Sequence, residues 1–322
     1  MTKATEKPAT AAPTSRARPA GAAHATLEAR QVRLGYGGEP IIDGLDLAVI
    51  PGAITAIVGA NASGKSTLLR GLDRLLTPQG GTVLLDGANI AGLPPRRVAR
   101  RVAILPQAPT APDGITVGDL VARGRFPHQG WFRRRSADDE RAVAAALAAT
   151  TTQDLAWRPM DALSGGQRQR VWLAMALAQE TDILLLDEPT TYLDIAHQVE
   201  LLDLVATLNE ERGCTVVMVL HDLNQAARYA DHLVAMRGGQ IVAAGPPGEI
   251  VTEQMVRRVF GMECRVLRDP VEGTPVIIPA GRRRRARVAH DTPTARDTPA
   301  THSTPAGEKL PADEKALAKE NG

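Results

Sequence analysis

The chain has 322 residues, enough for one large domain or two small ones with an ample core, and its formal net charge is only +2. The positive excess lies in the two ends, because residues 1–30 and 281–322 are each net positive and the part between them is net negative. Aromatic residues make up only 3% of the chain, so it offers neither a basic domain surface nor a stacking platform for bases, and we expect no nucleic-acid partner.

Cysteine usage and hydropathy indicate a reducing compartment. Cys214 and Cys264 have no metal-binding spacing and form no disulfide framework. No apolar stretch approaches the roughly 18 residues needed to span a bilayer, and no signal-peptide run opens the chain. We therefore expect a soluble cytoplasmic protein. Residues 1–26 and 281–322 are predicted to be disordered tails, and the arginines at 282–285 either contact anionic lipid or are simply solvated.

The first part of the chain reads as strands joined by turns. Alternating apolar residues predict strands over residues 27–34 and 45–49, and Pro51-Gly52 turns the chain into an apolar strand, residues 54–58. Tyr36 lies in a glycine-rich turn between the first two strands.

A glycine-rich loop follows the third of these strands and precedes a helical stretch. It has the spacing G-x-x-x-x-G-K-S, which predicts a phosphate loop when it lies between a strand and a helix. Backbone N–H groups and the helix N-terminus would bind phosphate, Lys65 would reach the outer phosphates, and the Ser66 hydroxyl would ligate Mg²⁺. The alternative is an ordinary glycine-rich turn. The predicted nucleotide-binding residues here are Gly59, Ala60, Asn61, Ala62, Ser63, Gly64, Lys65, Ser66 and Thr67.

The pattern of strands is interrupted in the middle of the chain. Residues 80–85 predict a hairpin or an edge strand, and residues 100–105 predict a strand that ends at Pro106-Gln107. Strand patterns are then absent over about residues 108–162, where capping boxes at Thr116 and Ser136 indicate helix starts. We expect this stretch to be a helical subdomain inserted into an α/β core.

The second half returns to alternating helices and strands. Leu163-Ser-Gly-Gly-Gln167 opens a helix that runs through Ala178, and the strand 215–220 ends at His221. The further expected elements are the buried strand 183–186, a helix over 198–208, strands near 233–236 and 240–244, a helix over 248–260, and strands over 263–268 and 275–278.

Asp187 and Glu188 directly follow the buried apolar strand 183–186. A carboxylate at this position can hold Mg²⁺ through water, so Asp187 is a candidate metal ligand. Glu188 would point towards the γ-phosphate, which makes it a candidate general base for an attacking water. The alternative, a solvated acidic turn, fits poorly with an apolar strand before it and a phosphate loop upstream.

Taken together, the phosphate loop, the Leu163–Gln167 stretch and residues 183–188, in this order, resemble the ATP-binding subunit of ABC transporters. The Leu-Ser-Gly-Gly-Gln stretch is the specific part of the resemblance, which covers roughly residues 27–280. It implies an α/β fold: a P-loop NTPase core with a parallel sheet, an N-terminal antiparallel β-subdomain, and the inserted helical subdomain.

The resemblance also implies roles for particular residues. Tyr36 matches the aromatic that stacks on adenine, Gln107 the glutamine that senses Mg²⁺, and His221 the histidine that contacts the γ-phosphate. Leu193-Asp194 matches a loop that crosses the dimer interface. In the family, a signature at a helix N-terminus completes the ATP site of the opposite subunit, so the protein should work as a head-to-tail pair enclosing two ATP molecules. The signature residues are Ser164, Gly165, Gly166 and Gln167.

Two residues of the loop depart from the family pattern. Ala60 stands where proline is common, and Ala62 stands where glycine is common. Ala62 costs backbone freedom. Because Lys65 and Ser66 are present, we expect ATP binding to survive.

Two further segments are similar to the ATPases of importers for ferric siderophores, haem and cobalamin. They are Arg123-Gly-Arg-Phe-Pro-His128 and the stretch from Val259 to Pro275. We favour ferric siderophores as cargo, with haem, cobalamin or another metal chelate as alternatives. The resemblance implies separate multi-spanning permease subunits, an indirect extracytoplasmic substrate-binding protein, a second ATPase subunit, and a peripheral place on the cytoplasmic face of the membrane. The rival of another class is a soluble, non-transport ABC ATPase.

Overall fold

A computed structural model describes residues 25–130, 135–191 and 193–281. The two predicted tails lie outside the described residues, apart from positions 25, 26 and 281. Within the described part of the chain, no helix combines the length and the apolar character needed to cross a membrane.

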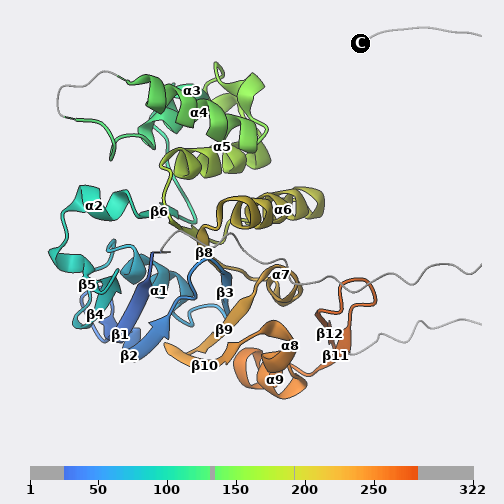
Figure 1. Cartoon of the computed structure of the whole chain (residues 1–322). Coiled ribbons are helices and arrows are strands. Elements are labelled where there is room, and N and C mark those ends of the chain that lie inside the picture. The colour runs from blue at the N-terminus through green and yellow to red at the C-terminus, as the bar shows by residue number, and fades with distance from the viewer. Residues whose placement is uncertain (1–24, 131–134, 192, 282–322) are drawn as a thin grey trace, which may run out of the picture. The chain divides into compact units, whose positions relative to one another are not determined.

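A six-stranded sheet forms the middle of the structure, with strand order β10-β9-β3-β8-β7-β6 (Figure 1). Every neighbouring pair is parallel except β10 and β9. The strands are β3 (Ile54–Gly59), β6 (Val102–Leu105), β7 (Ile183–Asp187), β8 (Thr215–Val219), β9 (His232–Arg237) and β10 (Gln240–Gly245). The parallel core expected from the sequence is confirmed.

The parallel sheet is buried on both faces. Leu184 and Leu186 of β7 pack into one apolar cluster, whereas Ile183 and Leu185 pack into the other. Because successive strand residues point to opposite faces, a run without polar residues needs a cover on each side. This explains why the sequence of β7 is uniformly apolar up to Asp187.

An antiparallel sheet with order β2-β1-β4-β5 shares the second cluster. Its strands are β1 (Leu27–Leu34), β2 (Ile42–Ala48), β4 (Gly80–Leu85) and β5 (Ala88–Asn89). The expected N-terminal antiparallel sheet is therefore confirmed. Of the two alternatives for residues 80–85, the hairpin holds, since β4 turns into β5. It is not an edge strand, because it also pairs with β1.

Helix α1 (Lys65–Leu72) starts at the glycine-rich loop and lies between the two sheets. Leu68, Leu69 and Leu72 are fully buried in the second cluster. This packing holds the first turn of α1, which carries the loop's lysine and hydroxyl, at the carboxyl end of β3. The short η1 (Ile90–Gly92) and α2 (Pro95–Ala99) follow the antiparallel sheet and lead to β6.

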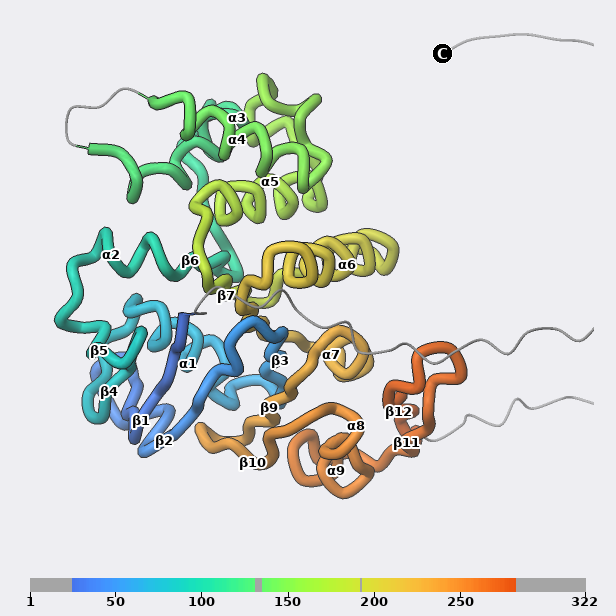
Figure 2. The backbone as a smooth tube through the Cα atoms, in the orientation of Figure 1, coloured from blue at the N-terminus to red at the C-terminus, as the bar shows by residue number. Residues whose placement is uncertain are grey.

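The chain then passes from β6 into a group of helices and returns through α5 to β7 (Figure 2). Helices α3 (Val117–Arg123), α4 (Ala137–Ala149) and α5 (Gly165–Ala178) pack against one another. Two 3₁₀ turns, η2 (Gln153–Leu155) and η3 (Met160–Ala162), join α4 to α5. The described part of residues 108–162 holds no strand, so the helices expected there are present, and α5 belongs to the same bundle.

The remaining elements follow the parallel sheet. They are α6 (Ile195–Arg212), α7 (Leu223–Tyr229), α8 (Pro247–Ile250), α9 (Glu253–Phe260), and the two-stranded sheet of β11 (Cys264–Arg268) and β12 (Pro275–Pro279).

Several sequence-based boundaries need correction, among them that of the strand expected over 45–49, which is β2 and begins at Ile42. The expected helix over 248–260 is two helices, because Thr252 is extended and caps α9 by accepting from Met255 N. The expected strand over 100–105 begins only at Val102, since Arg100 ends α2. Helix α6 exceeds the expected 198–208 because Asp194 caps its start and Gly213, with φ of 64°, ends it. Strand β8 ends at Val219, two residues before His221, because Leu220 already lies beyond the strand.

One of the two expected capping boxes is complete. At Ser136 the side chain accepts from Asp139 N, and the Asp139 carboxylate accepts from Ser136 N. At Thr116 the hydroxyl accepts from Asp119 N but donates to the Asp119 carboxylate. The helix is capped at both places, but only the first of them has the reciprocal pair.

Candidate functional site

The glycine-rich loop joins β3 to α1 in a conformation that requires its glycines. A Cβ on Gly59 would lie 2.3 Å from Met236 O, so no side chain fits there. Gly64 precedes α1 with φ of 98°, in the left-handed region. Ala62 also has a left-handed φ, 60°, so this departure from the family pattern does lie where the backbone favours glycine.

Lys65 lies inside the loop rather than in solvent. Its residue is only 4% exposed, and Nζ donates to Gly59 O and to Ala60 O at 3.0 Å each. Burial lowers the pKa of Lys65, while the carboxylates of Glu188 and Asp187 act in the opposite direction. An ammonium has three donors, so this geometry leaves one for an anion in the loop.

Ser66 and Asp187 form a pair beneath the loop. Ser66 Oγ donates to Asp187 Oδ1 at 2.8 Å, and Asp187 Oδ2 is buried with no hydrogen-bond partner among the described residues. Burial raises the pKa of Asp187, although the hydrogen bond from Ser66 opposes this. A buried, unpartnered carboxylate oxygen beside a hydroxyl is a set of hard oxygen donors, and such donors suit Mg²⁺. The residues present therefore fit this ion.

Glu188 is held by three side chains at the end of β7. Its Oε2 accepts from Gln107 Nε2 at 2.5 Å and from Thr191 Oγ1 at 3.4 Å, and its Oε1 lies 2.7 Å from His221 Nε2. The residue is 7% exposed and has a φ of 53°, which is unusual for a non-glycine residue. Such strained residues concentrate at functional sites.

The order of the sheet explains why these side chains meet. Strands β6, β7 and β8 are parallel neighbours, and Gln107, Glu188 and His221 follow their carboxyl ends. Because the carboxyl ends of parallel strands lie on one edge, residues far apart in sequence meet there. Sequence reasoning missed Thr191. A hydroxyl three residues after an acid is too common a pattern to indicate this contact.

A cleft of about 340 Å³ opens at this edge. It contains most of the predicted phosphate-binding residues together with the three residues that follow the strands. Its lining consists of Asn61, Ala62, Ser63, Gly64, Lys65, Ser66, Thr67, Gln107, Glu188 and His221. Gly59 and Ala60 contribute the carbonyls that hold Lys65, and Asp187 lies below Ser66.

Tyr36 and the signature residues lie outside this cleft. Tyr36 is 58% exposed, and its hydroxyl accepts from Arg70 Nη1 at 3.1 Å. Ser164 caps α5, with its Oγ accepting from Gln167 N and its own N–H donating to Gln167 Oε1. None of the residues 164–167 lines the cleft. The adenine-stacking role of Tyr36 and the role of the signature stay predictions.

A glycine-rich loop between a strand and a helix, with an Asp-Glu pair at the carboxyl end of another strand of the same parallel sheet, is typical of a P-loop nucleotide-binding protein. The model of the ABC transporter family matches residues 42–191 of this chain. Together with relatives that are 40% or more identical over most of their length, this match shows that the chain belongs to the ABC transporter family, as an ATP-binding subunit.

Among curated proteins, the probable siderophore transport system ATP-binding protein YusV of Bacillus subtilis is 56% identical, over 80% of this chain and 94% of its own. The ferric enterobactin transport ATP-binding protein FepC of Escherichia coli is 54% identical, over 80% and 95%. Among solved structures, an inward-facing putative metal-chelate type ABC transporter is 27% identical with a TM-score of 0.69, over 80% of this chain and 98% of that one.

Proposed function

We propose that the protein hydrolyses ATP to power an ABC importer for ferric siderophores. The observation that carries the proposal is one cleft in which the buried lysine, the Ser66–Asp187 pair and the Glu188 carboxylate meet. Positive charge, a metal-ligand pair and a base are the parts that phosphoryl transfer to water needs. The relatives named for siderophore and enterobactin transport support the cargo class.

Each part of the cleft has a role in the proposed reaction. Loop N–H groups and Lys65 bind and neutralise the β- and γ-phosphates. Ser66, Asp187 and the amide oxygen of Gln107 would hold Mg²⁺, which when bound supplies further charge neutralisation. Glu188 would accept a proton from the attacking water, and His221, 2.7 Å from Glu188 Oε1, would orient that carboxylate. Because His221 also lines the cleft, it would contact the γ-phosphate.

The signature belongs to a second site in this proposal. Ser164 and the first residues of α5 do not line the chain's own cleft, and they would bind the γ-phosphate held by a second subunit. Two subunits, arranged head to tail, would then enclose two ATP molecules. Tyr36, whose side chain is exposed, would stack on adenine.

The transport partners follow from the class of protein. Separate permease subunits would carry the cargo through the membrane, an extracytoplasmic binding protein would deliver it, and this subunit would lie on the cytoplasmic face. ATP binding would close the pair of subunits, and hydrolysis would reopen it. The ATPase subunit does not contact the cargo in this scheme, so the cargo is tested by transport.

The test is uptake by cells in which the gene for this chain is deleted and then restored. Radioactive iron is supplied as ferric enterobactin or a ferric hydroxamate, and haem and cobalamin uptake are measured in the same strains. We expect loss of ferric-siderophore uptake on deletion, rescue by the wild type, and no rescue by Lys65→Ala. Loss of haem or cobalamin uptake alone would reassign the cargo, and unchanged uptake of all three would support a non-transport ABC ATPase instead.

A further inference from the structure

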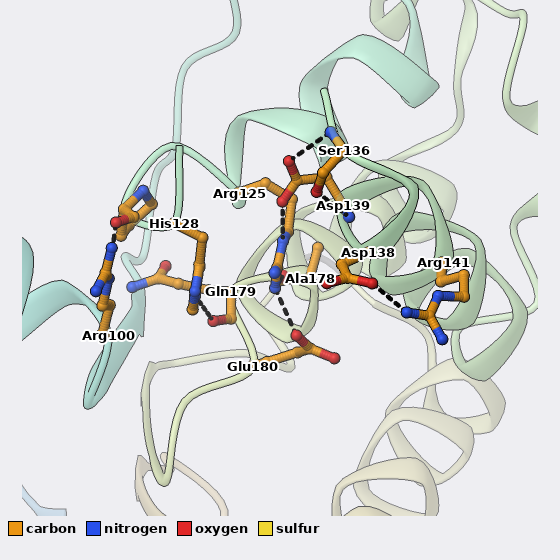
Figure 3. A network of polar contacts seen from close by, with 11 residues as sticks. Arg100, Arg125, His128, Ser136, Asp138, Asp139, Arg141, Ala178, Gln179 and Glu180 are labelled. Atoms are coloured by element: carbon orange, nitrogen blue, oxygen red, sulfur yellow. Dashed lines mark hydrogen bonds and ion pairs between the residues drawn. The ribbon is translucent and has the colours of Figure 1, made fainter. Parts of the chain in front are cut away.

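The carboxyl end of α5, the helix that begins at the signature, is held by the segment Arg123–His128. Arg125 Nη1 donates to Ala178 O at 2.8 Å, and His128 Nε2 lies 2.8 Å from Gln179 O (Figure 3). Because a carbonyl only accepts, this contact requires the proton on His128 Nε2. The last carbonyls of a helix have no partner within it, and here a cation and an imidazole supply two.

Arg125 anchors this end to the rest of the helical bundle. Its guanidinium is buried and also pairs with Asp139 at 3.0 Å and with Glu180 at 2.6 Å. Asp139 belongs to the capping box of α4. One side chain, two residues beyond the end of α3, thus joins the start of α4 to the end of α5.

Gln179, at the carboxyl end of α5, connects the helical bundle to the parallel sheet. Its amide Nε2 donates to Ala99 O at 2.5 Å and to Val102 O at 3.0 Å, at the end of α2 and the first residue of β6. A second contact joins the same two parts, since Arg100 Nε donates to Pro127 O at 2.9 Å. The carboxyl end of α5 is therefore fastened to the amino end of β6.

The other ends of these two elements carry residues of the proposed ATP site. Strand β6 leads to Gln107, which bonds Glu188, and α5 starts at the signature serine, Ser164. A helix of 14 residues is about 20 Å long, so a tilt of about 5° at its fastened end moves the far end by roughly 2 Å. Donors that stabilise a developing charge must be placed more accurately than that.

We propose that Gln179, with His128 capping its carbonyl, is a positioning residue that joins the signature helix to β6. In this role it sets where Ser164 lies relative to Gln107, and it never contacts nucleotide itself. The inference rests on the proposed function, because it concerns a signature that acts on ATP. It also gives a role to the Arg123–His128 segment, which forms no part of the cleft.

The first test replaces Gln179 by leucine, which keeps the size of the side chain and removes both amide bonds. The matched control is Gln240→Leu on β10, which removes a glutamine amide bond to Asp43 O of β2, away from α5. We expect kcat for ATP to fall at least about tenfold in Gln179→Leu, since two hydrogen bonds are lost and each changes an equilibrium by roughly fivefold. ATP affinity of the isolated subunit should stay within about twofold, because the loop is untouched, and the control should match the wild type.

The second test asks whether Gln179 acts through the end of β6. In a Gln107→Ala background, adding Gln179→Leu should lower kcat by less than about twofold, because the partner it positions is gone. A full tenfold loss in that background, or a wild-type kcat in Gln179→Leu, would overturn the inference.

A third variant keeps the inference testable if Gln179→Leu does not fold. His128→Leu removes the cap on Gln179 O at a half-buried position, and we expect a fall in kcat of roughly fivefold with unchanged ATP affinity. An unchanged kcat in this variant would likewise overturn it. An inactive wild type would contradict the proposed function and this inference together, whereas an active wild type with an unaffected variant would contradict this inference alone.

Discussion

Glu188 combines a left-handed backbone with a buried, fully engaged carboxylate. The backbone strain and the desolvation of the carboxylate both cost free energy. The contacts of the carboxylate with Gln107, Thr191 and His221 offset this cost and hold it beside the cleft. This arrangement places a base without allowing it rotational freedom, so replacing only its charge is an informative change.

We predict that Glu188→Gln binds ATP but hydrolyses it at least about 100-fold more slowly, the scale of a lost general base. Because ATP is then retained, the variant should accumulate as an ATP-bound dimer. Phosphate release and size-exclusion chromatography with ATP measure the two effects. Glu249→Gln, at an exposed position of α8, is the matched control and should behave as the wild type. Unchanged hydrolysis in Glu188→Gln would remove this residue as the base.

Ala62 carries a side chain at a φ of 60°, where glycine has no steric cost. The strain of a non-glycine residue in this region is about 1–2 kcal/mol, and glycine gives back about 0.4–1 kcal/mol through a freer unfolded chain. We therefore predict that Ala62→Gly raises the free energy of unfolding by about 0.5–1 kcal/mol, measured by urea unfolding without nucleotide.

The control for Ala62→Gly has the opposite sign. Ala144 lies at an exposed position inside α4, where glycine is unfavourable. Ala144→Gly should lower the free energy of unfolding by about 1 kcal/mol. If both changes destabilise the protein, the loop does not store strain at Ala62.

Asp73 follows the last turn of α1, where the helix dipole is negative. Burial raises the pKa of Asp73 to about 7, so the folded state holds its proton more tightly than the unfolded chain does. Stability attributable to this carboxyl is therefore present at low pH and is lost as the pH rises from about 4 towards 7. Its side chain is partly exposed to solvent, which reduces the size of the effect.

We predict that Asp73→Asn is more stable than the wild type at pH 8 by at least about 1 kcal/mol and differs less from it at pH 5. Urea unfolding at the two pH values measures the difference. Asp113→Asn, which replaces an exposed loop aspartate, is the matched control measured in the same way. An advantage for Asp73→Asn that is equal at both pH values would show that the carboxyl titrates normally.

At the scale of elements, Ser164 at the start of α5 has two roles, one in capping the helix and one in the proposed dimer. Ser164 caps the helix by accepting from Gln167 N, and in the proposed dimer the same end of the helix receives the γ-phosphate of the second subunit. The two purposes can be separated, because aspartate is as good an N-cap as serine but repels an anion.

We predict that Ser164→Asp keeps its free energy of unfolding within about 0.5 kcal/mol of the wild type and loses ATP-driven dimerisation. The control is Ser136→Asp, at the equivalent position of the capping box of α4. Unfolding curves and sedimentation with ATP, in the Glu188→Gln background, give both readouts. Dimerisation that persists in Ser164→Asp would place the signature away from the phosphate.

At the scale of the molecule, both apolar clusters are made by described residues that precede position 282. The stability of the folded part should therefore not depend on residues 282–322. We predict that removing residues 282–322 leaves the urea midpoint and kcat of the remaining chain unchanged. Loss of folding in the truncated chain would contradict the prediction of a disordered tail.

Sequence alone determined the phosphate loop, the acidic pair at the end of β7 and most of the strands. These features depend on local spacing: a loop must follow a strand and precede a helix, and a strand buried on both faces must be apolar throughout. The polar residues at the ends of such strands could be identified as candidate site residues, because their position directly after an apolar strand is also visible in the local sequence. The sequence also showed that Ala62 stands where glycine is common in the family, and that this substitution has a cost, since glycine alone avoids the strain of a left-handed backbone.

The tertiary structure decided which of these candidates touch one another. Gln107, Glu188 and His221 meet because β6, β7 and β8 are neighbours in the sheet, and nothing in the local sequence states that order. The contacts of Gln179 with Ala99 and Val102 join segments far apart in the sequence, through an amide group that has no distinctive pattern. The contact of Thr191 with Glu188 is local, but its hydroxyl has no distinctive pattern either. The local sequence predicts the chemical role of a residue, whereas long-range packing determines which other residues it contacts.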